Sequence, residues 1–300
     1  MQTQKTFIDD IKHQYTHGGM TIRLIFINVI VFVAINLLLV FGRLLGFELG
    51  ISNFLGNLFS LQTSFWGFIT HPWALFTSIF AHYTIWHLLF NMIFLYFTGR
   101  IFVQLFNAKR LLYTYIIGGL AGGLFEIIAQ IIFPNLQSVV IVGASGSIMA
   151  IFFAIAFYQP KMQVNLFGVL PVRIIILAGV FLLADLLNLG INDGTAHFAH
   201  IGGAVIGMVS IQNIHSPGNI ITLSQRIVIA ILQLFSSNKK PKFKVKKGGN
   251  VRHQTDDQYN ENKKGKQDEI NRILDKISKS GYESLTKKEK DFLFNQSKNG

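Results

Sequence analysis

The chain has 300 residues, of which half are hydrophobic and only 14% are charged, and it contains no cysteine. The lack of cysteine excludes disulfides and thiolate metal sites. Of the formal net charge of +12, +9 lies from Arg226 onward, so a basic tail follows a nearly uncharged body. Such a body is typical of a polytopic membrane protein, and a tail beside anionic lipid explains the basic excess without nucleic acid.

Six apolar stretches follow one another, and each approaches the roughly 20 residues that a spanning helix needs. Lys and Arg are concentrated in alternate connections, whereas the opposite set of connections offers only Arg43. By the positive-inside rule both termini are cytoplasmic, including the polar segment 1–19. The sequence therefore predicts an all-α, six-transmembrane-helix bundle, multi-pass in the inner membrane, with a cytoplasmic basic tail. The stretches are Met20–Phe41, His82–Thr98, Leu111–Phe133, Gly143–Gln159, Arg173–Leu189 and Ala196–Gln212.

The first outer loop, Gly42 to Ala81, is long and still apolar. A loop that simply crossed water would be polar. We therefore expect it to be partly helical and to lie in the membrane interface, with Trp66 and Trp73 at headgroup level.

The fourth stretch is short and opens with Ser145 between small residues. Its residues Gly146, Ala150 and Ala154 recur every four positions, which allows another helix to approach closely. The sixth stretch has the same spacing in Ala199, Gly203 and Gly207. We expect these two helices to pack backbone against backbone, which would bring the side chains at their outer ends together.

Four polar side chains on three helices are expected at one depth in the outer leaflet: Ser145, His200, His87 and Asn91. Interhelical hydrogen bonding explains any one of them alone, but four at a common depth indicate function. Ser145 is then the nucleophile and His200 its base, while the Ser145 N–H, His87 and Asn91 donate to an oxyanion.

A third catalytic group is not expected from the sequence. Glu126 and Asp185 are predicted to lie elsewhere, and the outer loop after the fifth stretch offers only Asp193. The interpretation is therefore a serine–histidine dyad whose imidazole is held by close packing. The G-x-S-x-G pattern of α/β-hydrolases is not matched, because position 147 is Ser.

Three motifs carry a resemblance to the rhomboid intramembrane serine proteases over about residues 20 to 212. Gly143-Ala144-Ser145-Gly146 resembles their G-x-S-G, and the segment from Ala199-His200 to Gly207 resembles their sixth-helix A-H-x-x-G-x-x-x-G. The run from His82 to Asn91 is similar to their second-helix histidine-and-asparagine motif.

The resemblance implies a six-helix protease domain over residues 20–215 that cleaves transmembrane protein substrates near the outer membrane face. It implies the roles given above for Ser145, His200, His87 and Asn91, and no cofactor, metal or nucleic acid. It also implies that the fifth helix is a gate for substrates. Supporting positions would be His82, Gly143, Gly146, Gly203 and Gly207.

Three positions depart from the family's pattern: Ala74 where Arg is usual after Trp, Gln104 where an acid is common, and Met149 where a tyrosine often stacks on the catalytic histidine. None of them removes a catalytic atom. Their expected effect is on rate and stability rather than on mechanism.

Two other functions fit the same body. A non-catalytic rhomboid-like chaperone would bind unstable transmembrane helices in the same cavity, but it would have no need of both Ser145 and His200. A proton-coupled carrier would show an inverted repeat or paired broken helices, which the sequence does not.

The tail is expected to comprise a basic flexible linker, residues 236–267, and a small two-helix module, residues 268–298. One helical stripe ends at Gly281. Thr286-Lys287-Lys288-Glu289 is a capping-box pattern that opens a second helix. A docking module and a solubilising tail fit this pattern equally well. The stripe consists of Ile270, Ile273, Leu274 and Ile277.

Overall fold

The computed structural model describes residues 14–16, 18–136, 140–166, 168–191, 193–235 and 256–297. It divides into two compact units, Met1–Ser237 and Asn238–Gly300, which are described separately. The predicted N-terminal segment 1–19 and linker 236–267 lie largely outside the described residues.

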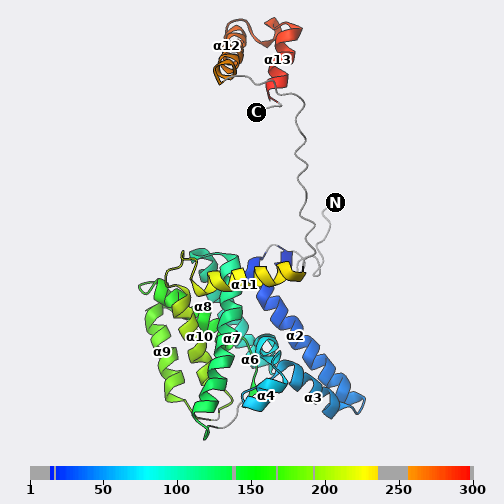
Figure 1. Cartoon of the computed structure of the whole chain (residues 1–300), viewed down its shortest axis with the longest axis vertical. Helices are drawn as coiled ribbons and strands as arrows, with labels where there is room; N and C mark the ends of the chain where they lie inside the picture. The colour runs from blue at the N-terminus through cyan, green and yellow to red at the C-terminus, as the bar shows by residue number, and fades with distance from the viewer. Residues whose placement is uncertain are drawn as a thin grey trace. The chain divides into compact units, whose positions relative to one another are not determined.

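Six helices of the first unit coincide with the six predicted apolar stretches (Figure 1). Among the residues that the structure describes, three of these helices, α2, α6 and α7, are long and apolar enough to cross a membrane. The other three have 14 residues each. The bounds are α2 Gly19–Leu44, α6 Ile85–Leu105, α7 Ala108–Ile132, α8 Ser145–Tyr158, α9 Ile174–Leu187 and α10 His197–Ser210.

The loop between α2 and α6 is partly helical, as the sequence predicts. It contains α3 (Glu48–Phe59), α4 (Phe65–Thr70), α5 (Ala74–Thr77) and the 3₁₀ turn η1 (Ser78–Phe80). Ser64 caps α4 by accepting a hydrogen bond from the Gly67 N–H. Between α3 and α4, strand β1 (Leu61–Gln62) pairs antiparallel with β2 (Val140–Ile141), which ties this loop to the segment before α8.

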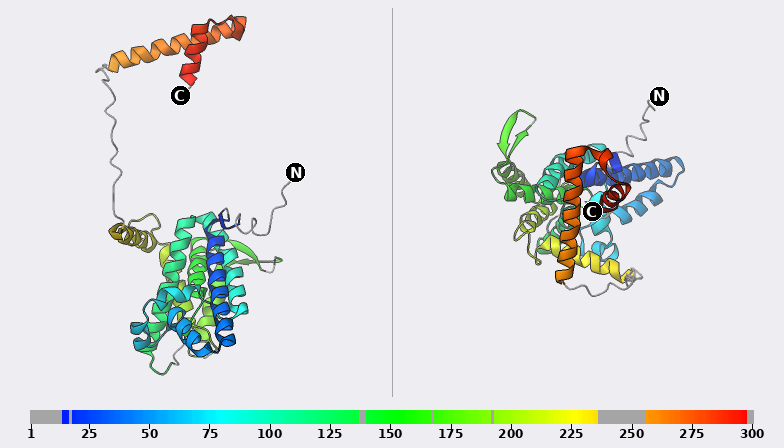
Figure 2. Two further views of the ribbon diagram at one scale, coloured as in Figure 1. Left: turned by 90° about the vertical axis from the view of Figure 1, so that its right-hand side faces the viewer. Right: turned by 90° about the horizontal axis from the view of Figure 1, so that it is seen from above.

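The connection between α8 and α9 forms a β-hairpin that the sequence analysis does not predict. Strand β3 (Gln163–Leu166) pairs antiparallel with β4 (Leu170–Arg173), with Val164 opposite Val172. Gly168 in the turn has φ +76°, a conformation that glycine adopts without strain. The hairpin projects from the side of the bundle (Figure 2).

A second unpredicted element, α11 (Ile220–Phe235), runs across the bundle rather than along it (Figure 1). The Asn219 side chain accepts a hydrogen bond from the Ile221 N–H, in the manner of an N-cap, and donates to the carbonyl of Ser210. Arg110 of α7 donates to the same carbonyl and to Asn219. This buried network joins the start of α11 to α7 and α10.

The core is built on α8, in which every residue from Gly146 to Ala156 is buried. A helix that is apolar on all sides is stable only when other helices surround it. α7 and α10 approach it most closely, because glycines face it. A Cβ atom at Gly203 would overlap the Gly146 carbonyl oxygen, and one at Gly207 would overlap that of Ala150. The predicted backbone-close packing of α8 against α10 is confirmed.

The second unit contains α12 (Asp256–Ser280), the 3₁₀ turn η2 (Tyr282–Ser284) and α13 (Lys287–Ser297). α12 begins twelve residues before position 268, so the predicted linker is wrong over this part. Residues 256–267 include three Lys, two Gln and one Glu, which have high helix propensity, and they extend a helix that the apolar stripe stabilises.

The predicted capping box and helix end in this unit are both confirmed. The Glu289 carboxylate accepts from the Thr286 N–H at 2.7 Å, and the Glu289 N–H donates to the Thr286 hydroxyl at 3.4 Å. Gly281, at φ +74°, follows the last residue of α12.

Candidate active site

A cavity of about 530 Å³ brings together the four side chains that the sequence analysis selects, Ser145, His200, His87 and Asn91. They come from α8, α10 and α6, which are distant in the sequence. The rest of the wall comes from the residues just before α6, from β2 and the residue after it, and from the loop before α10. These lining residues are Tyr83, Thr84, Val140, Ile141, Val142, Gly194, Thr195 and Ala196.

Ser145 is the first residue of α8, and the backbone before it is held at two consecutive positions. The Gly143 N–H donates to the Ser78 carbonyl at 2.9 Å, and the Ala144 N–H donates to His82 Nε2 at 3.4 Å. His82 is fully buried, which fits the supporting role implied for it. The nucleophile candidate therefore stands at a helix N-terminus, where backbone N–H groups and the helix dipole favour negative charge.

His87 lies directly against this backbone. Gly143 has φ +116°, and a Cβ atom there would come within 2.7 Å of His87 Nε2. Glycine is required here on both counts, because of the left-handed backbone and the close approach of the ring. The His82 and His87 rings meet edge to face with centroids 4.9 Å apart, which further restricts the orientation of the His87 ring.

Asn91 lies one turn further along α6 on the same face of the helix. Its Nδ2 donates one hydrogen bond, of 2.8 Å, to the His87 carbonyl. A carboxamide nitrogen carries two hydrogens, so a second donor remains available. The start of α6 is capped by Thr84, whose hydroxyl accepts from the His87 N–H.

His200 has a carboxylate partner, and here the sequence analysis is wrong. His200 Nδ1 lies 2.9 Å from Asp185 Oδ1, and Asp185 is buried. Asp185 occupies the last turn of α9, and the adjacent α10 starts at that same end of the bundle. The signal was present in the sequence, since Asp185 is the one acidic residue of the fifth apolar stretch and lies near its outer end.

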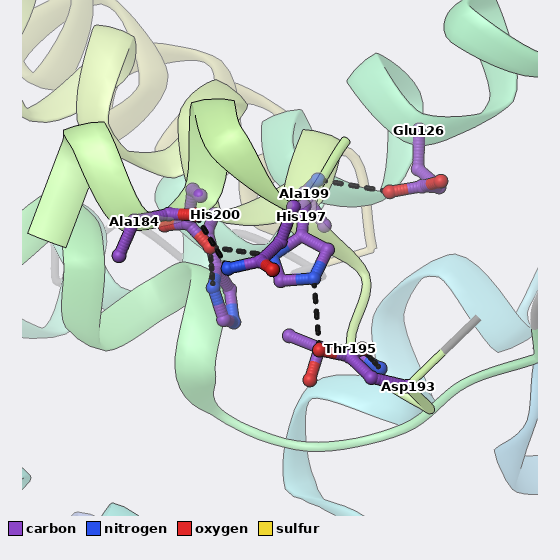
Figure 3. Close-up of polar contacts among 9 residues, drawn as sticks. Glu126, Ala184, Asp193, Thr195, His197, Ala199 and His200 are labelled. Carbon is purple, nitrogen blue, oxygen red and sulfur yellow. Dashed lines mark hydrogen bonds and ion pairs between the residues drawn. The ribbon is translucent and has the colours of Figure 1, made fainter. Parts of the chain in front are cut away.

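The same aspartate also contacts His197, at the start of α10. Asp185 Oδ1 lies 2.8 Å from His197 Nδ1, and Asp193 Oδ2 lies 3.2 Å from His197 Nε2 (Figure 3). The Thr195 backbone N–H donates to Asp193 and holds the pKa of that carboxyl below its usual value. Neither His197 nor Asp185 was selected from the sequence as a site residue.

The start of α10 is also held from α7. The buried Glu126 carboxylate accepts the Ala199 N–H at 3.0 Å, which satisfies one of the free N–H groups of the first helical turn (Figure 3). Together with the contacts of Gly203 and Gly207 on α8, this fixes the position of His200 along the bundle. Gly146 and Gly203 thus lie at the closest contact between α8 and α10.

Two of the departures from the family pattern, Ala74 and Met149, lie in buried surroundings. Ala74 is fully buried, and beside it the Trp73 indole N–H donates to the Asn57 carbonyl of α3 at 3.0 Å. This hydrogen bond ties the loop to α3 without a contribution from the side chain at position 74. Met149 is buried in the core around α8.

The family comparisons agree with this architecture. No curated protein matches the chain. Residues 253–299, which include the helices of the second unit, match a family of unknown function (DUF6576). Residues 69–216 match the Rhomboid domain, and this range contains α6 to α10 and every residue of the cavity. The chain is therefore a membrane protein of the rhomboid family.

Proposed function

We propose that the protein is an intramembrane serine endopeptidase in which Ser145 is the nucleophile and His200 its general base. The observation that carries this proposal is the shared cavity, in which a serine at a helix N-terminus, a histidine and two further donors meet. The contact between His200 and Asp185 extends the expected dyad to three residues, Ser145, His200 and Asp185.

The proposed chemistry assigns one step to each group. Asp185 accepts the Nδ1–H of His200, which leaves the lone pair of Nε2 free to take the proton of Ser145. The Ser145 oxygen attacks the peptide carbonyl, and the Ser145 N–H, His87 and Asn91 stabilise the oxyanion. His200 then protonates the leaving amine, and water hydrolyses the acyl-enzyme.

We further propose that the six apolar helices all cross the inner membrane, with both termini and the tail in the cytoplasm. The alternating distribution of Lys and Arg supports this orientation. α8, with 14 residues, has a length of about 21 Å, less than the roughly 30 Å hydrocarbon core. Ser145 at its outer end would then lie below the membrane surface, within reach of water.

We propose that transmembrane substrates enter between α6 and α9. A second cavity, of about 750 Å³ and almost entirely apolar, lies between these helices, and the β3–β4 hairpin forms part of its wall. Its lining residues Phe94 and Phe181 stack with centroids 5.5 Å apart. Contacts of this kind separate more easily than the glycine contacts of α8 and α10.

The alternative is a rhomboid-like protein that binds transmembrane helices without cleaving them. A fluorophosphonate probe distinguishes the two, because it reacts only with an activated serine. We expect the probe to label the full chain in detergent, and Ser145→Ala to abolish both labelling and cleavage of a single-span reporter.

Ser147→Ala is the matched control, since Ser147 lies two residues further along α8, fully buried and outside the cavity. It should keep both activities. Cleavage that persists in Ser145→Ala would refute the protease assignment. Reporter binding without labelling in the wild type would favour the chaperone.

A further inference from the structure

The cluster formed by Asp185, His197 and His200 has more partners than a simple catalytic aspartate requires. One carboxylate oxygen, Asp185 Oδ1, lies 2.8 Å from His197 Nδ1 and 2.9 Å from His200 Nδ1. One potential ligand atom from each of the three residues lies within 4.8 Å of the other two. Asp185 and His197 are buried and His200 is partly so, which limits competition from water.

The charges around the cluster favour a cation. Asp185, Asp193 and Glu126 surround the start of α10, and residues 174–225 contain no Lys or Arg. A neutral imidazole has a single N–H, yet each ring nitrogen of His197 faces a carboxylate oxygen. If the neutral His197 ring donates its one N–H from Nε2 to Asp193, the lone pair of Nδ1 points toward Asp185 Oδ1. A cation between Asp185 Oδ1 and the two Nδ1 atoms would bind that lone pair.

We propose that Asp185, His197 and His200 form a binding site for a divalent transition-metal ion, with Zn²⁺ as the preferred ion. Two imidazole nitrogens and one carboxylate oxygen are a donor set that Zn²⁺ takes in proteins, with a fourth position left for water. Tetrahedral bonds of roughly 2.0–2.2 Å place ligand atoms about 3.4 Å apart, slightly more than the two nitrogen–oxygen distances of 2.8 and 2.9 Å here. The sequence analysis predicts no metal site, because these residues are separated in the chain.

Asp193 supplies an independent argument. In protein metal sites the second nitrogen of a ligating histidine commonly donates to a carboxylate, which orients the ring. His197 has this arrangement, with Nδ1 toward the cluster and Nε2 3.2 Å from Asp193 Oδ2. Its ring is thus already turned into the orientation of a ligand.

The site has a consequence for catalysis, and this part rests on the proposed function. A metal ion on Nδ1 of His200 places the single N–H of the neutral ring on Nε2. That nitrogen then has no lone pair with which to take the proton of Ser145. We infer that Zn²⁺ reversibly inhibits the protease by fixing the wrong tautomer of its base.

The binding test needs no proteolytic activity. The full chain, purified in detergent without a histidine tag, is titrated with Co²⁺, whose tetrahedral complexes absorb strongly in the visible range, and Co²⁺ is then displaced with Zn²⁺. We expect one ion per chain. His197→Ala should abolish the band, and Asp193→Asn, which keeps all three ligands, should weaken binding about 10–100-fold. His215→Ala, which removes an exposed histidine outside the cluster, is the matched control and should bind as the wild type does.

The inhibition test compares each variant with its own metal-free rate. Zn²⁺ should suppress cleavage by the wild type and by His215→Ala over one concentration range, and His197→Ala should need at least about 10-fold more. A Co²⁺ band that is absent, or that survives in His197→Ala while the melting temperature is unchanged, overturns the metal site. A normal band in a chain that never cleaves would refute the protease and leave the site standing.

Discussion

The two sides of α8 are packed in opposite ways. Toward α10 and α7, glycines bring backbones into contact, and even one added methyl group would overlap a carbonyl oxygen. Toward α6 and α9, large aromatic side chains fill the space incompletely and leave a cavity of about 750 Å³. Of the residues of α9, only Ile174, Ala178 and Asp185 are buried. The close contacts with α7 and α10, the tight side, therefore fix the positions of Ser145 and His200. The helices α6 and α9, the loose side, can move without separating these two residues.

Asp185 lies on α9, on the loose side, but it contacts His200 on α10, on the tight side. Its removal should therefore have the largest effect on catalysis. Asp185→Asn removes the acceptor that fixes the His200 tautomer, and we expect kcat to fall roughly 10²–10⁴-fold, the range of general acid–base catalysis. Cleavage rate and melting temperature are measured with a chelator present. Asp193→Asn, which removes the neighbouring carboxylate without touching His200, should keep kcat within about 3-fold. Equal losses in the two variants would mean that the effect is one of charge and not of the His200 contact.

Asn91 tests the contribution of α6 to the same cavity. If its side chain donates to the oxyanion, Asn91→Ala should lower kcat about 10²-fold, or about 2.7 kcal/mol, with little change in melting temperature.

The matched control for Asn91 is Asn36→Ala on α2. Asn36 donates to the carbonyl four residues before it, as Asn91 does, but it lies outside the cavity. It should leave kcat unchanged. An Asn91→Ala variant that keeps full kcat, or loses it only in step with melting, would remove Asn91 from the oxyanion hole while leaving the Ser145–His200 assignment intact.

The packing difference itself is tested by one methyl group on each side. Gly203→Ala forces α10 away from the Gly146 carbonyl, and we expect it to destabilise the chain by about 1–3 kcal/mol. Gly179→Ala on α9 meets no atom within 4 Å and should be neutral or stabilising by up to about 1 kcal/mol. Thermal unfolding in detergent measures both. Similar melting temperatures for the two variants would contradict the contrast between the sides.

We expect the smallest effect in the second unit, which belongs to neither side of α8. The Thr286 N–H and Lys276 stabilise the Glu289 carboxylate and lower its pKa to about 2. Because the folded pKa is below the unfolded value, this stabilisation is present above about pH 4.5 and is lost as the pH falls toward 2. Hydrogen exchange of α13 in the full chain, corrected for intrinsic rates, should show protection falling over that window.

Glu289→Gln should weaken the protection of α13 already at neutral pH and flatten its pH dependence. Asp291→Asn removes one carboxylate from the same helix but leaves the capping box in place, so it should behave as the wild type. A wild-type profile in Glu289→Gln would contradict the role of the capping box.

The sequence alone predicted six apolar helices and the four residues Ser145, His200, His87 and Asn91 that line one cavity. Apolar runs predicted the helices α2 and α6 to α10. The four-residue spacing of Gly203 and Gly207 predicted the α8–α10 contact, because helical periodicity is a local property of the chain. It missed the β3–β4 hairpin, which depends on the turn at Gly168, and it missed α11, which begins after the cap at Asn219 and contains the apolar residues 227–232.

Only the tertiary structure decided which polar groups touch. Depth along a helix can be counted from the sequence, but the rotation of α9 about its axis cannot, because its apolar residues lie on all sides and define no single buried face. That rotation turns Asp185 toward His200 and His197, and so converts an expected dyad into a three-residue arrangement with a candidate metal site. Contacts of this kind join residues 12 and 15 positions apart across two helices, and packing alone sets them.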